Sequence, residues 1–361
     1  MAALKPKSEA ELAALVAEAH RAGRKLELRG AGTKTAGETG GEMVDLRALS
    51  GIESYEPAEL VLKAGAGTRL AEVEALLDGH NQMLAFEPPR FGDGTLGGMI
   101  AAGFSGPRRI AAGAVRDHVL GFTAVNGKGE VFKAGGPVVK NVTGYDLPKL
   151  VTGSWGSLVA LTSVTLKVLP KPRTSLTLAF TGLDAKAACA LMAEAMGSAA
   201  SVSGAAHAPD IESRTYLRLE GFEASVKARA EGLARLLGRE PEVLDQAASE
   251  ALWASFNDLT APKGKARDLW RVSVPPADGW KAVETLRLTG TIALMDWAGG
   301  LIWFSGEGDV EAVAKAAGGH ALKLRPGGPT RLEPGVAALS ARIKTAFDPG
   351  GVFVSARVGG G

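Results

Sequence analysis

Apolar residues recur at helical spacing over the first 23 positions. Four of them fall on one stripe when the segment is wound as a helix, which is typical of an amphipathic helix with one buried face. Ser8 and, three positions later, Glu11 form a capping-box sequence, and Gly23 can close the last turn. The pattern therefore predicts a helix between Ser8 and Gly23. Its buried stripe would consist of Leu12, Leu15, Val16 and Ala19.

The pattern then changes to an alternation of apolar and polar residues, which predicts strands. Residues 25–29 alternate and run directly into a glycine-rich turn at 30–34, where glycine permits positive φ angles or close approach of the backbone. A strand followed by such a turn is typical of a phosphate-binding loop. A second strand at 60–64, a turn at 65–67 and a helix at 68–79 repeat this order, and we interpret the second turn as a tight connection.

Glycine-rich segments dominate the chain from residue 87 to residue 156. Within this region, alternating residues on both sides of Asn126 and Gly127 predict a β-hairpin over 119–133. The segment 170–172, Pro-Lys-Pro, stops regular structure and is the best candidate for a linker. Between the hairpin and the linker we expect a glycine-rich loop at 140–146, a short helix that contains Pro148, and a strand at 159–169.

After residue 172, strand-like runs alternate with amphipathic helices, which predicts a layered α+β domain. The division at the linker gives two domains, 1–170 and 173–361. The expected strands are 176–180, 216–219, 269–274, 292–297 and 301–304, the last two joined by a hairpin turn at 298–300. The expected helices are 184–196, 224–237, 279–287, 309–317 and 334–346.

Composition narrows the class of protein. The 361 residues are 46% hydrophobic and 22% charged, as in globular proteins, and a net charge of +2 gives a polyanion such as nucleic acid little to bind. The longest uncharged run, 150–166, is too short and too polar to span a membrane. The single cysteine, Cys189, cannot form an intrachain disulfide and is expected to be buried and inert. We therefore expect a soluble, cytoplasmic protein.

The 48 glycines are the unusual feature, because they gather in loops before residue 160. Basic residues lie beside these loops, and successive backbone N–H groups could bind the two phosphates of an extended ligand. The alternative is that the glycines only allow the loops to pack closely and that the loops bind no ligand. The basic residues are Arg29, Lys34, Arg108, Arg109, Arg116 and Lys140.

Short motifs exclude several other chemistries. The dinucleotide fingerprint is incomplete, because Thr35 and Leu70 stand where its third glycine should be. No P-loop sequence occurs, and the segment 103–107 is one residue out of step with a hydrolase nucleophile elbow. The five histidines have no metal-ligand spacing, so we expect no metal site.

Four segments together resemble the FAD-binding domain of the vanillyl-alcohol-oxidase and FAD-linked oxidase superfamily. They are residues 29–34, 95–103, 113–121 and 140–150. More closely, the whole chain is similar to the FAD-binding subunits of bacterial glycolate oxidases, which work with a second flavoprotein subunit and an iron–sulfur subunit. The similarity is specific over about residues 5–172. It implies an α+β fold with a two-subdomain FAD-binding domain of the vanillyl-alcohol-oxidase type, followed by an α+β domain with an antiparallel sheet and helices.

The resemblance also implies which residues hold the cofactor. FAD should be bound noncovalently, because Thr33 stands where covalent relatives carry a histidine. Two departures are Val159, in place of a glycine near the adenine, and the ending 353–357, which keeps only the first and last residues of the usual motif. The implied cofactor-binding residues are Arg29, Gly30, Ala31, Gly32, Thr33, Lys34, Pro88, Thr95, Leu96, Gly97, Gly98, Ala101, Gly103, Gly113, Arg116, Asp117, Val119, Gly153 and Gly156.

Catalytic residues are harder to predict. Oxidation of a 2-hydroxy acid needs a base for the hydroxyl proton and a cation or metal for the carboxylate. Residues 173–361 contain only His207 and His320, far apart, so a metal centre is not expected. Weak candidates are Arg90, Arg108 and Arg109 for the carboxylate and Tyr145 for the proton.

Three functional hypotheses remain open. The favoured one is an electron-transferring FAD subunit of a glycolate or other 2-hydroxy-acid oxidase complex, which meets its substrate indirectly and reaches the inner membrane only through its partners. The others are a self-sufficient FAD-dependent dehydrogenase and a flavin-free scaffold. In the second domain, two aromatic pairs could anchor a partner subunit, although packing in the core is the favoured explanation. They are Trp253 with Phe256 and Trp297 with Trp303.

Overall fold

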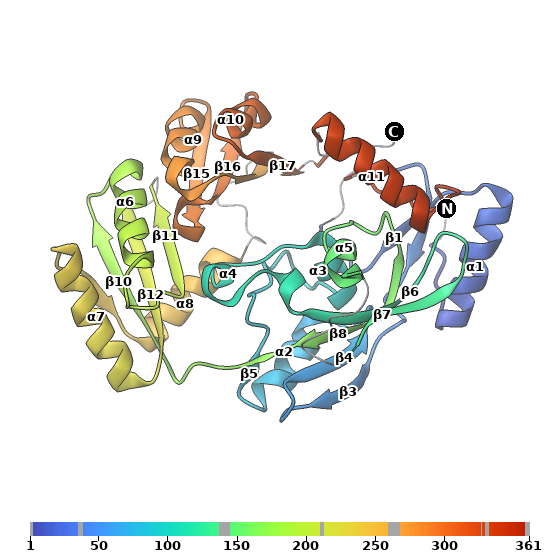
Figure 1. The fold of residues 1–361 in the computed structure, drawn as a ribbon, viewed down its shortest axis with the longest axis horizontal. Helices are drawn as coiled ribbons and strands as arrows, with labels where there is room; N and C mark the ends of the chain where they lie inside the picture. Colours follow the sequence, from blue (N-terminus) through green and yellow to red (C-terminus); the bar gives the residue numbers. More distant parts are fainter. Residues whose placement is uncertain are drawn as a thin grey trace. The chain divides into compact units, whose positions relative to one another are not determined.

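The computed structural model forms two compact units (Figure 1). It describes residues 3–34, 39–136, 145–209, 213–258, 268–325, 327–328 and 332–357. Unit 1 comprises residues 1–104, 114–170 and 327–361, and unit 2 comprises residues 105–113 and 171–326.

These units differ from the predicted division at 170–173 in two segments. Residues 327–361 join unit 1, because the side chains of Ile343 and Phe347 pack against its core. Residues 105–113 join unit 2, because Ile110 packs against the core of that unit. Neither of these two differences could be predicted from the local sequence, because each depends on which of the two cores an apolar side chain contacts.

Unit 1 is built on a five-stranded antiparallel sheet in the order β3-β4-β8-β6-β7. Its strands are β3 (Ile52–Glu56), β4 (Val61–Gly65), β6 (Val119–Val125), β7 (Val131–Gly135) and β8 (Ala160–Lys167). The predicted hairpin is present as β6 and β7, with Val125 opposite Val131. The helices of this unit are α1 (Glu9–Ala22), α2 (Leu70–Asp78), α3 (Leu96–Ala102), α5 (Leu147–Val151) and α11 (Pro334–Phe347), with a 3-10 turn η1 (Val115–Asp117).

Two small sheets complete unit 1. Strand β1 (Leu26–Arg29) pairs in parallel with β2 (Glu42–Asp45), and β5 (Gln82–Met83) pairs with β9 (Leu169–Pro170). The side chain of Ser8 caps α1 as predicted, since its hydroxyl accepts a hydrogen bond from the Glu11 amide. All four residues of the predicted α1 stripe lie in or against one apolar cluster, which also holds the side chain of Phe353.

A buried carboxylate, that of Asp348, stabilises the turn that brings the C-terminal segment back to β1. The side chain of Asp348 accepts hydrogen bonds from the amides of Val352 (2.8 Å) and Phe353 (2.7 Å) and pairs with Lys344 Nζ. The amide of Leu26 then donates to the carbonyl of Val352 at 2.7 Å. A Cβ atom at Gly127 would lie 2.1 Å from Asp348 Oδ1, so only glycine leaves room for this carboxylate.

Unit 2 contains an eight-stranded antiparallel sheet in the order β13-β10-β12-β11-β15-β16-β14-β17. Its strands are β10 (Thr174–Thr181), β11 (Gly204–Ala208), β12 (Arg214–Gly221), β13 (Glu242–Leu244), β14 (Leu269–Ser273), β15 (Gly290–Asp296), β16 (Leu301–Gly306) and β17 (His320–Arg325). Its helices are α4 (Arg109–Ala112), α6 (Ala185–Met196), α7 (Glu223–Leu237), α8 (Gln246–Asn257), α9 (Gly279–Leu286) and α10 (Val310–Ala316), with 3-10 turns η2 (Pro276–Asp278) and η3 (Trp297–Gly299).

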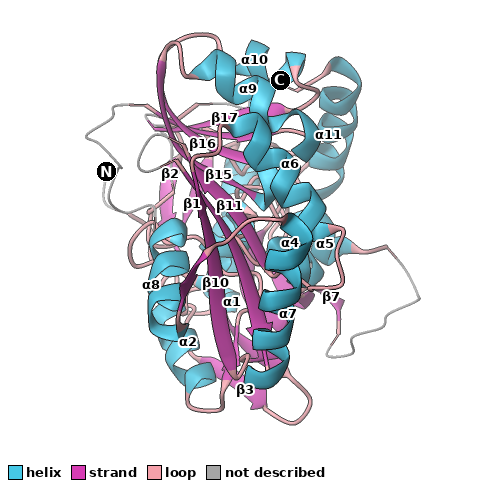
Figure 2. Cartoon of the chain, turned by 90° about the vertical axis from the view of Figure 1, so that its left-hand side faces the viewer, coloured by secondary structure: helices cyan, strands magenta, loops and turns pink. Residues whose placement is uncertain are grey.

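The two faces of β10 have different partners, as the alternation of its side chains requires. Leu178 and Phe180 point into the main core with α6 and α7. On the other face, Thr177 accepts a hydrogen bond from Trp253 Nε1 of α8 at 2.9 Å. Figure 2 shows β10 with α7 on one side and α8 on the other. The sheet is therefore covered on both faces along this strand.

The four aromatic residues considered as an interface are buried. Their exposed fractions are 3% for Trp253, 7% for Phe256, 6% for Trp297 and 4% for Trp303. The rings of Trp253 and Phe256 contact each other edge to face with centroids 5.4 Å apart. Core packing therefore explains these residues, and the interface hypothesis for them is wrong.

Across the described residues, no helix has the length and apolar character that crossing a bilayer would require.

Replacing Asp348 with alanine should destabilise unit 1. The change leaves two buried amides without their acceptor and removes the ion pair of Lys344, which should lower the free energy of unfolding by about 3 kcal/mol. The control is Asp93→Ala, which removes an exposed ion pair with Arg69 and should cost at most about 1 kcal/mol. Equal midpoints of urea unfolding for the two variants would contradict the role assigned to Asp348.

Candidate functional site

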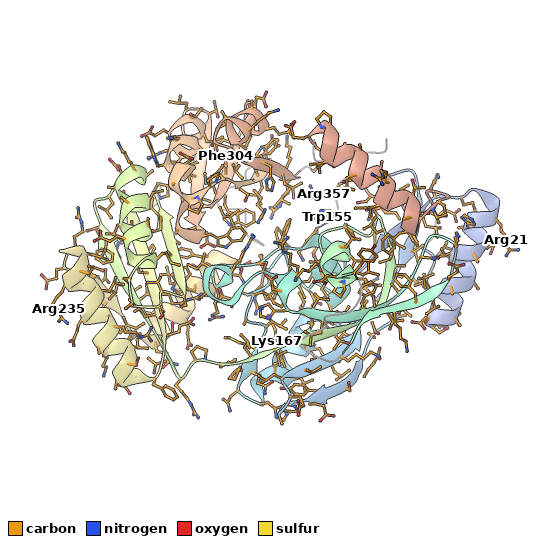
Figure 3. All side chains as sticks on the ribbon, in the orientation of Figure 1. Arg21, Trp155, Lys167, Arg235, Phe304 and Arg357 are labelled. Carbon is orange, nitrogen blue, oxygen red and sulfur yellow. The ribbon has the colours of Figure 1, made fainter. Side chains whose placement is uncertain are left out.

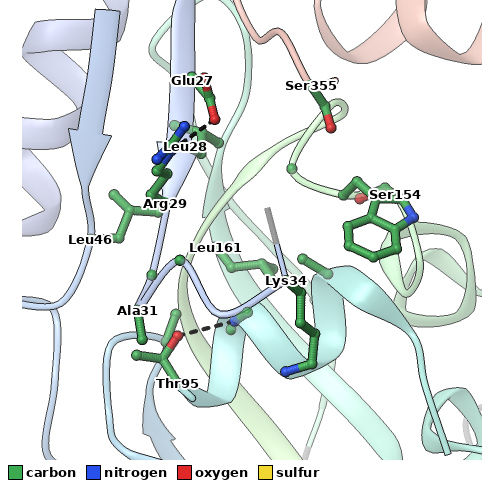
Figure 4. A pocket seen from close by; sticks show the side chains of 18 of the residues that line it. Glu27, Leu28, Arg29, Ala31, Lys34, Leu46, Thr95, Ser154, Leu161 and Ser355 are labelled. Carbon is green, nitrogen blue, oxygen red and sulfur yellow. Dashed lines mark hydrogen bonds and ion pairs between the residues drawn. The ribbon is translucent and has the colours of Figure 1, made fainter. Parts of the chain in front are cut away.

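A pocket in unit 1 is enclosed by segments that lie far apart in the sequence (Figure 4). One wall is β1 with the glycine-rich turn that follows it, a second is the start of α3, and a third is the turn at 154–156 with the beginning of β8. Residues 354–357 complete it. The lining residues are Glu27, Leu28, Arg29, Gly30, Ala31, Gly32, Thr33, Lys34, Leu46, Ala66, Thr95, Gly97, Gly98, Ala101, Ser154, Trp155, Gly156, Val159, Leu161, Val354, Ser355, Ala356 and Arg357.

The glycine-rich turn after β1 packs directly against the start of α3. A Cβ atom at Gly30 would lie 2.1 Å from Thr95 Oγ1, so a side chain at this position would push the two segments apart. Thr95 uses the same oxygen to cap α3, accepting a hydrogen bond from the Gly98 amide at 3.3 Å. Gly32 has a φ angle of 72°, in the left-handed region that favours glycine.

The start of α3 also contacts the turn between β4 and α2. The amide of Gly97 donates to the carbonyl of Ala66 at 2.7 Å, and a Cβ atom at Gly97 would lie 2.8 Å from Ala66 Cβ. In that turn, a Cβ atom at Gly67 would lie 2.5 Å from the carbonyl oxygen of Leu46. The second glycine turn thus brings backbones together, as a tight connection requires.

The pocket is rich in positive charge. Arg29 pairs with Glu27 at 2.8 Å, and Glu27 is the one acidic residue among the described residues of the lining. Burial lowers the pKa of Lys34 to about 8. Its ammonium lies 5.2 Å from the centre of the Phe91 ring, and no carboxylate of the described chain pairs with it. The pocket therefore keeps a desolvated cation beside its glycine-rich wall.

Arg357 adds a second buried cation. It is 3% exposed, and burial lowers its pKa to about 10. Its Nη2 atom donates to the carbonyl of Lys34 at 3.3 Å, while its guanidinium lies 5.1 Å from the centre of the Trp155 ring. Figure 3 shows Arg357 and Trp155 beside each other. The C-terminal segment thus contacts both the glycine-rich turn and the turn at 154–156.

Eleven of the residues expected to hold a cofactor line this pocket: Arg29, Gly30, Ala31, Gly32, Thr33, Lys34, Thr95, Gly97, Gly98, Ala101 and Gly156. Eight others do not line it: Pro88, Leu96, Gly103, Gly113, Arg116, Asp117, Val119 and Gly153.

Several of these eight residues have structural roles instead. A Cβ atom at Gly103 would lie 2.9 Å from the Cα of Gly153, so this pair lets two backbone segments approach. The Asp117 carboxylate accepts a hydrogen bond from the Ala114 amide at 2.9 Å and closes a turn. Leu96 is fully buried in the core.

Sequence reasoning missed most of the pocket's far wall. Val159 had been noted only as a departure, yet it lines the pocket, and the C-terminal ending had been given no role. The signal that could have found Trp155 is its place in a Gly-Ser-Trp-Gly turn, where its φ angle is 55°. Loop residues 140–144, including Lys140, lie outside the described residues.

The weak catalytic candidates do not gather in the pocket. Arg90 pairs with Glu74 at 2.8 Å, and the side chain of Tyr145 is 94% exposed. In unit 2, the Arg109 guanidinium stacks on the Trp297 ring at 4.1 Å. In the described chain, no group of three or more histidine, cysteine, aspartate or glutamate side chains could hold a metal ion.

Arg108 is committed to an internal ion pair in unit 2. It pairs with Glu220 at 2.7 Å, and both side chains are largely buried. Burial by itself would raise the pKa of Glu220, but the charges of Arg218 and Arg108 outweigh burial and lower that pKa to about 2. The pair therefore stays ionised at neutral pH and holds the strand end in place.

Comparisons with known proteins identify the family of the chain. Residues 1–135 match a family model described as an FAD binding domain. Glycolate oxidase subunit GlcE of Escherichia coli K12 is 38% identical over 330 residues, which cover 88% of this chain and 87% of that protein. A D-lactate dehydrogenase of Anaerostipes hadrus is 36% identical over 141 residues, which cover 38% of this chain and 29% of that enzyme.

Among solved structures, an alkyldihydroxyacetonephosphate synthase has a similar fold, with a TM-score of 0.70 and 16% sequence identity over 96% of this chain and 74% of that one. This similarity confirms the predicted fold class, an α+β protein with an FAD-binding domain of the vanillyl-alcohol-oxidase type. The identity to the Escherichia coli subunit extends through both units. The chain therefore belongs to the family of FAD-dependent oxidoreductases that includes glycolate oxidase subunit GlcE.

Proposed function

We propose that this chain is a noncovalent FAD-binding subunit of a complex that oxidises glycolate or a related 2-hydroxy acid, and that the pocket of unit 1 holds the FAD. The observation that carries the proposal is the pocket itself. Its walls are rich in glycine where backbone segments approach each other, and they carry positively charged side chains that could bind an anion. The names of the relatives, a glycolate oxidase subunit and a D-lactate dehydrogenase, support the substrate class.

The residues present fit FAD by shape and by charge. Gly30 and Gly97 keep two wall segments free of side chains, so an extended dinucleotide can approach the main chain. Among the described residues of the lining, Arg29, Lys34 and Arg357 contribute three positive charges and Glu27 contributes one negative charge, an excess of two positive charges. The diphosphate of FAD carries about two negative charges at neutral pH, so it would balance this excess.

The side chains of the described lining support noncovalent attachment. Covalent flavin attachment needs a nucleophilic side chain, and the described pocket lining includes no histidine, cysteine or tyrosine. Thr33 occupies the loop position where covalent relatives would place histidine. The apolar side chains of Ala101, Val159 and Leu161 would instead exclude water from the bound cofactor.

Bound FAD supplies the hydride-accepting chemistry that this chain's amino acids lack. The residues of the pocket would hold and orient the cofactor. Oxidation of the substrate also needs a base that accepts its hydroxyl proton. Glu27 is engaged with Arg29, and Lys34, the other side chain of the described lining with a pKa near neutrality, is mostly protonated at pH 7. This supports a subunit that passes electrons within a complex, whose other members would be a second flavoprotein and an iron–sulfur protein.

Placing a carboxylate in the glycine-rich turn should abolish FAD binding. Gly32→Glu adds negative charge beside the proposed diphosphate site, and we expect the affinity for FAD to fall at least about 100-fold. Gly23→Glu is a matched control, because Gly23 has a similar φ angle of 65° but lies at the end of α1 with nothing within 4 Å. Affinities are measured by quenching of flavin fluorescence, and equal affinities in both variants would contradict the placement.

The affinity for FAD should depend on the charge of Lys34. Its pKa of about 8 in the free protein should rise when the diphosphate binds beside it. Binding therefore takes up a proton above pH 8, and the affinity should fall as pH rises from 7 to 9, by up to about tenfold per pH unit. Lys34→Arg, which stays charged, should remove this dependence. An identical pH profile in both proteins would show that Lys34 does not face the anion.

Turnover should require partner subunits. We expect the FAD-saturated chain alone to reduce an artificial dye with glycolate or D-lactate at a rate near background, because Glu27 is paired with Arg29 and Lys34 is mostly protonated at neutral pH. Adding the second flavoprotein and the iron–sulfur subunit of the complex should raise the rate by at least about 100-fold. Rapid bleaching of the flavin by substrate in the isolated chain would instead favour a self-sufficient dehydrogenase.

A further inference from the structure

The pocket contains a buried carboxylate that lies apart from Lys34. Glu27 is 8% exposed and is the one acidic side chain among the described residues of the lining. Figure 4 shows its carboxylate at one end of the pocket and the Lys34 ammonium and the Thr95 hydroxyl at the other. A carboxylate beside the diphosphate would repel it, so the end that holds Glu27 suits a different part of the ligand.

The Glu27 carboxylate is held in place and can still accept hydrogen bonds. Arg29 Nε donates to Oε1 at 2.8 Å, and the Thr39 hydroxyl donates to Oε2 at 2.6 Å. A carboxylate has about four acceptor sites, and these two bonds occupy one site on each oxygen. Each oxygen can therefore accept a further hydrogen bond from a ligand in the pocket. Because a carboxylate accepts but does not donate, the matching ligand groups are donors such as hydroxyls.

FAD carries two adjacent hydroxyls on its adenosine ribose, next to the diphosphate. Such hydroxyls can donate to the two oxygens of one carboxylate, and acidic side chains hold a ribose hydroxyl in dinucleotide sites of another fold. The ribityl chain of the flavin half also carries hydroxyls, but the flavin ring must remain accessible to its reaction partner. The adenosine half takes no part in the reaction and can be enclosed completely. A buried carboxylate therefore favours the ribose.

We propose that Glu27 is a specificity-determining residue of the pocket, whose carboxylate, fixed by Arg29 and Thr39, accepts hydrogen bonds from the ribose hydroxyls of the adenosine half of FAD. The proposal rests on the pocket being the FAD site proposed above. It assigns an orientation to the cofactor, with the adenosine ribose at the Glu27 end and the diphosphate toward Lys34 and the glycine-rich turn. It also assigns a preference for nucleotides with a complete ribose.

The test compares ADP with 2′-deoxy-ADP, which lacks one ribose hydroxyl, as competitors of FAD on the full-length chain freed of flavin. The wild-type chain should bind ADP at least about tenfold more tightly, because the deoxy analogue loses a hydrogen bond to a charged acceptor. In Glu27→Gln the acceptor is neutral, and the preference should fall to about threefold or less. Affinities come from displacement of FAD, followed by flavin fluorescence. Each ratio is taken within one protein, so a general loss of affinity cancels.

Inorganic pyrophosphate separates a hydrogen bond to the ribose from an effect of charge alone. It has no sugar, so Glu27→Gln should bind it as tightly as the wild type does, or up to about threefold more tightly, since the change removes a negative charge from the pocket. A loss of affinity for pyrophosphate equal to the loss for ADP would mean that Glu27 only positions Arg29, and it would overturn the proposal.

Glu42→Gln is the matched control. Glu42 lies on the neighbouring strand β2 and pairs with Arg24 at 3.0 Å, but it does not line the pocket. The variant should keep the wild-type preference for ADP over 2′-deoxy-ADP. Thermal unfolding of each apoprotein verifies that the variants are folded, and the wild-type preference tests the proposal without any substitution.

Two further results would overturn the role of Glu27. One is a wild-type chain that binds 2′-deoxy-ADP as tightly as ADP. The other is a Glu27→Gln variant with the wild-type preference. Both results leave the FAD pocket intact provided that ADP competes with FAD and that Gly32→Glu abolishes the binding of both. If Gly32→Glu binds both normally, the pocket itself is misplaced and the ribose site falls with it, so the two failures are distinguished.

Discussion

The buried carboxylate of Asp348 ties the end of unit 1 to its beginning. By accepting hydrogen bonds from the amides of Val352 and Phe353, it forms the turn that returns the chain to β1. The side chains of Val352 and Phe353 are then almost fully buried, and each contributes about 1.5–3 kcal/mol by burial. The pairing of Val354 with Leu26 depends on this turn, and the position of Arg357 depends on that pairing. One wall of the pocket therefore rests on a carboxylate that does not line it.

Much of the fold can be predicted where the signal is local. Three features have a sequence signal within a few residues: the cap at Ser8, the turn at Asn126 and Gly127, and the glycine-rich turn after β1. Strand β11 cannot be found in this way, because its sequence Gly-Ala-Ala-His-Ala has no branched or aromatic residue. It is a strand because β12 and β15 pair with its two edges. Helix α8 did carry a local signal, the Asp245 cap on Ala248, which the sequence analysis overlooked.

The same distinction between local and long-range signals applies to the pocket. The half of the pocket built from residues 29–34 and 95–101 follows from glycines whose spacing is visible in the sequence. The other half includes Arg357, whose contact with Lys34 joins residues 323 positions apart, and no local pattern reports such a contact. Arginines were equally ambiguous as substrate ligands, since Arg108 and Arg90 form ion pairs with Glu220 and Glu74 that only the folded chain brings within reach. A basic residue beside a glycine loop indicates charge, but the fold decides what the charge contacts.

The contact between Arg357 and Lys34 also constrains when the pocket proposed to hold FAD can be complete. A ribosome delivers the chain from its N-terminus, and domains tend to fold in that order during synthesis. The glycine-rich turn is thus made 323 residues before the guanidinium that reaches it. Capture of FAD during translation would meet a pocket with one wall missing. The pocket proposed to hold FAD is accordingly complete only in the released polypeptide, and a nascent chain stalled before residue 354 would lack the wall that residues 354–357 form.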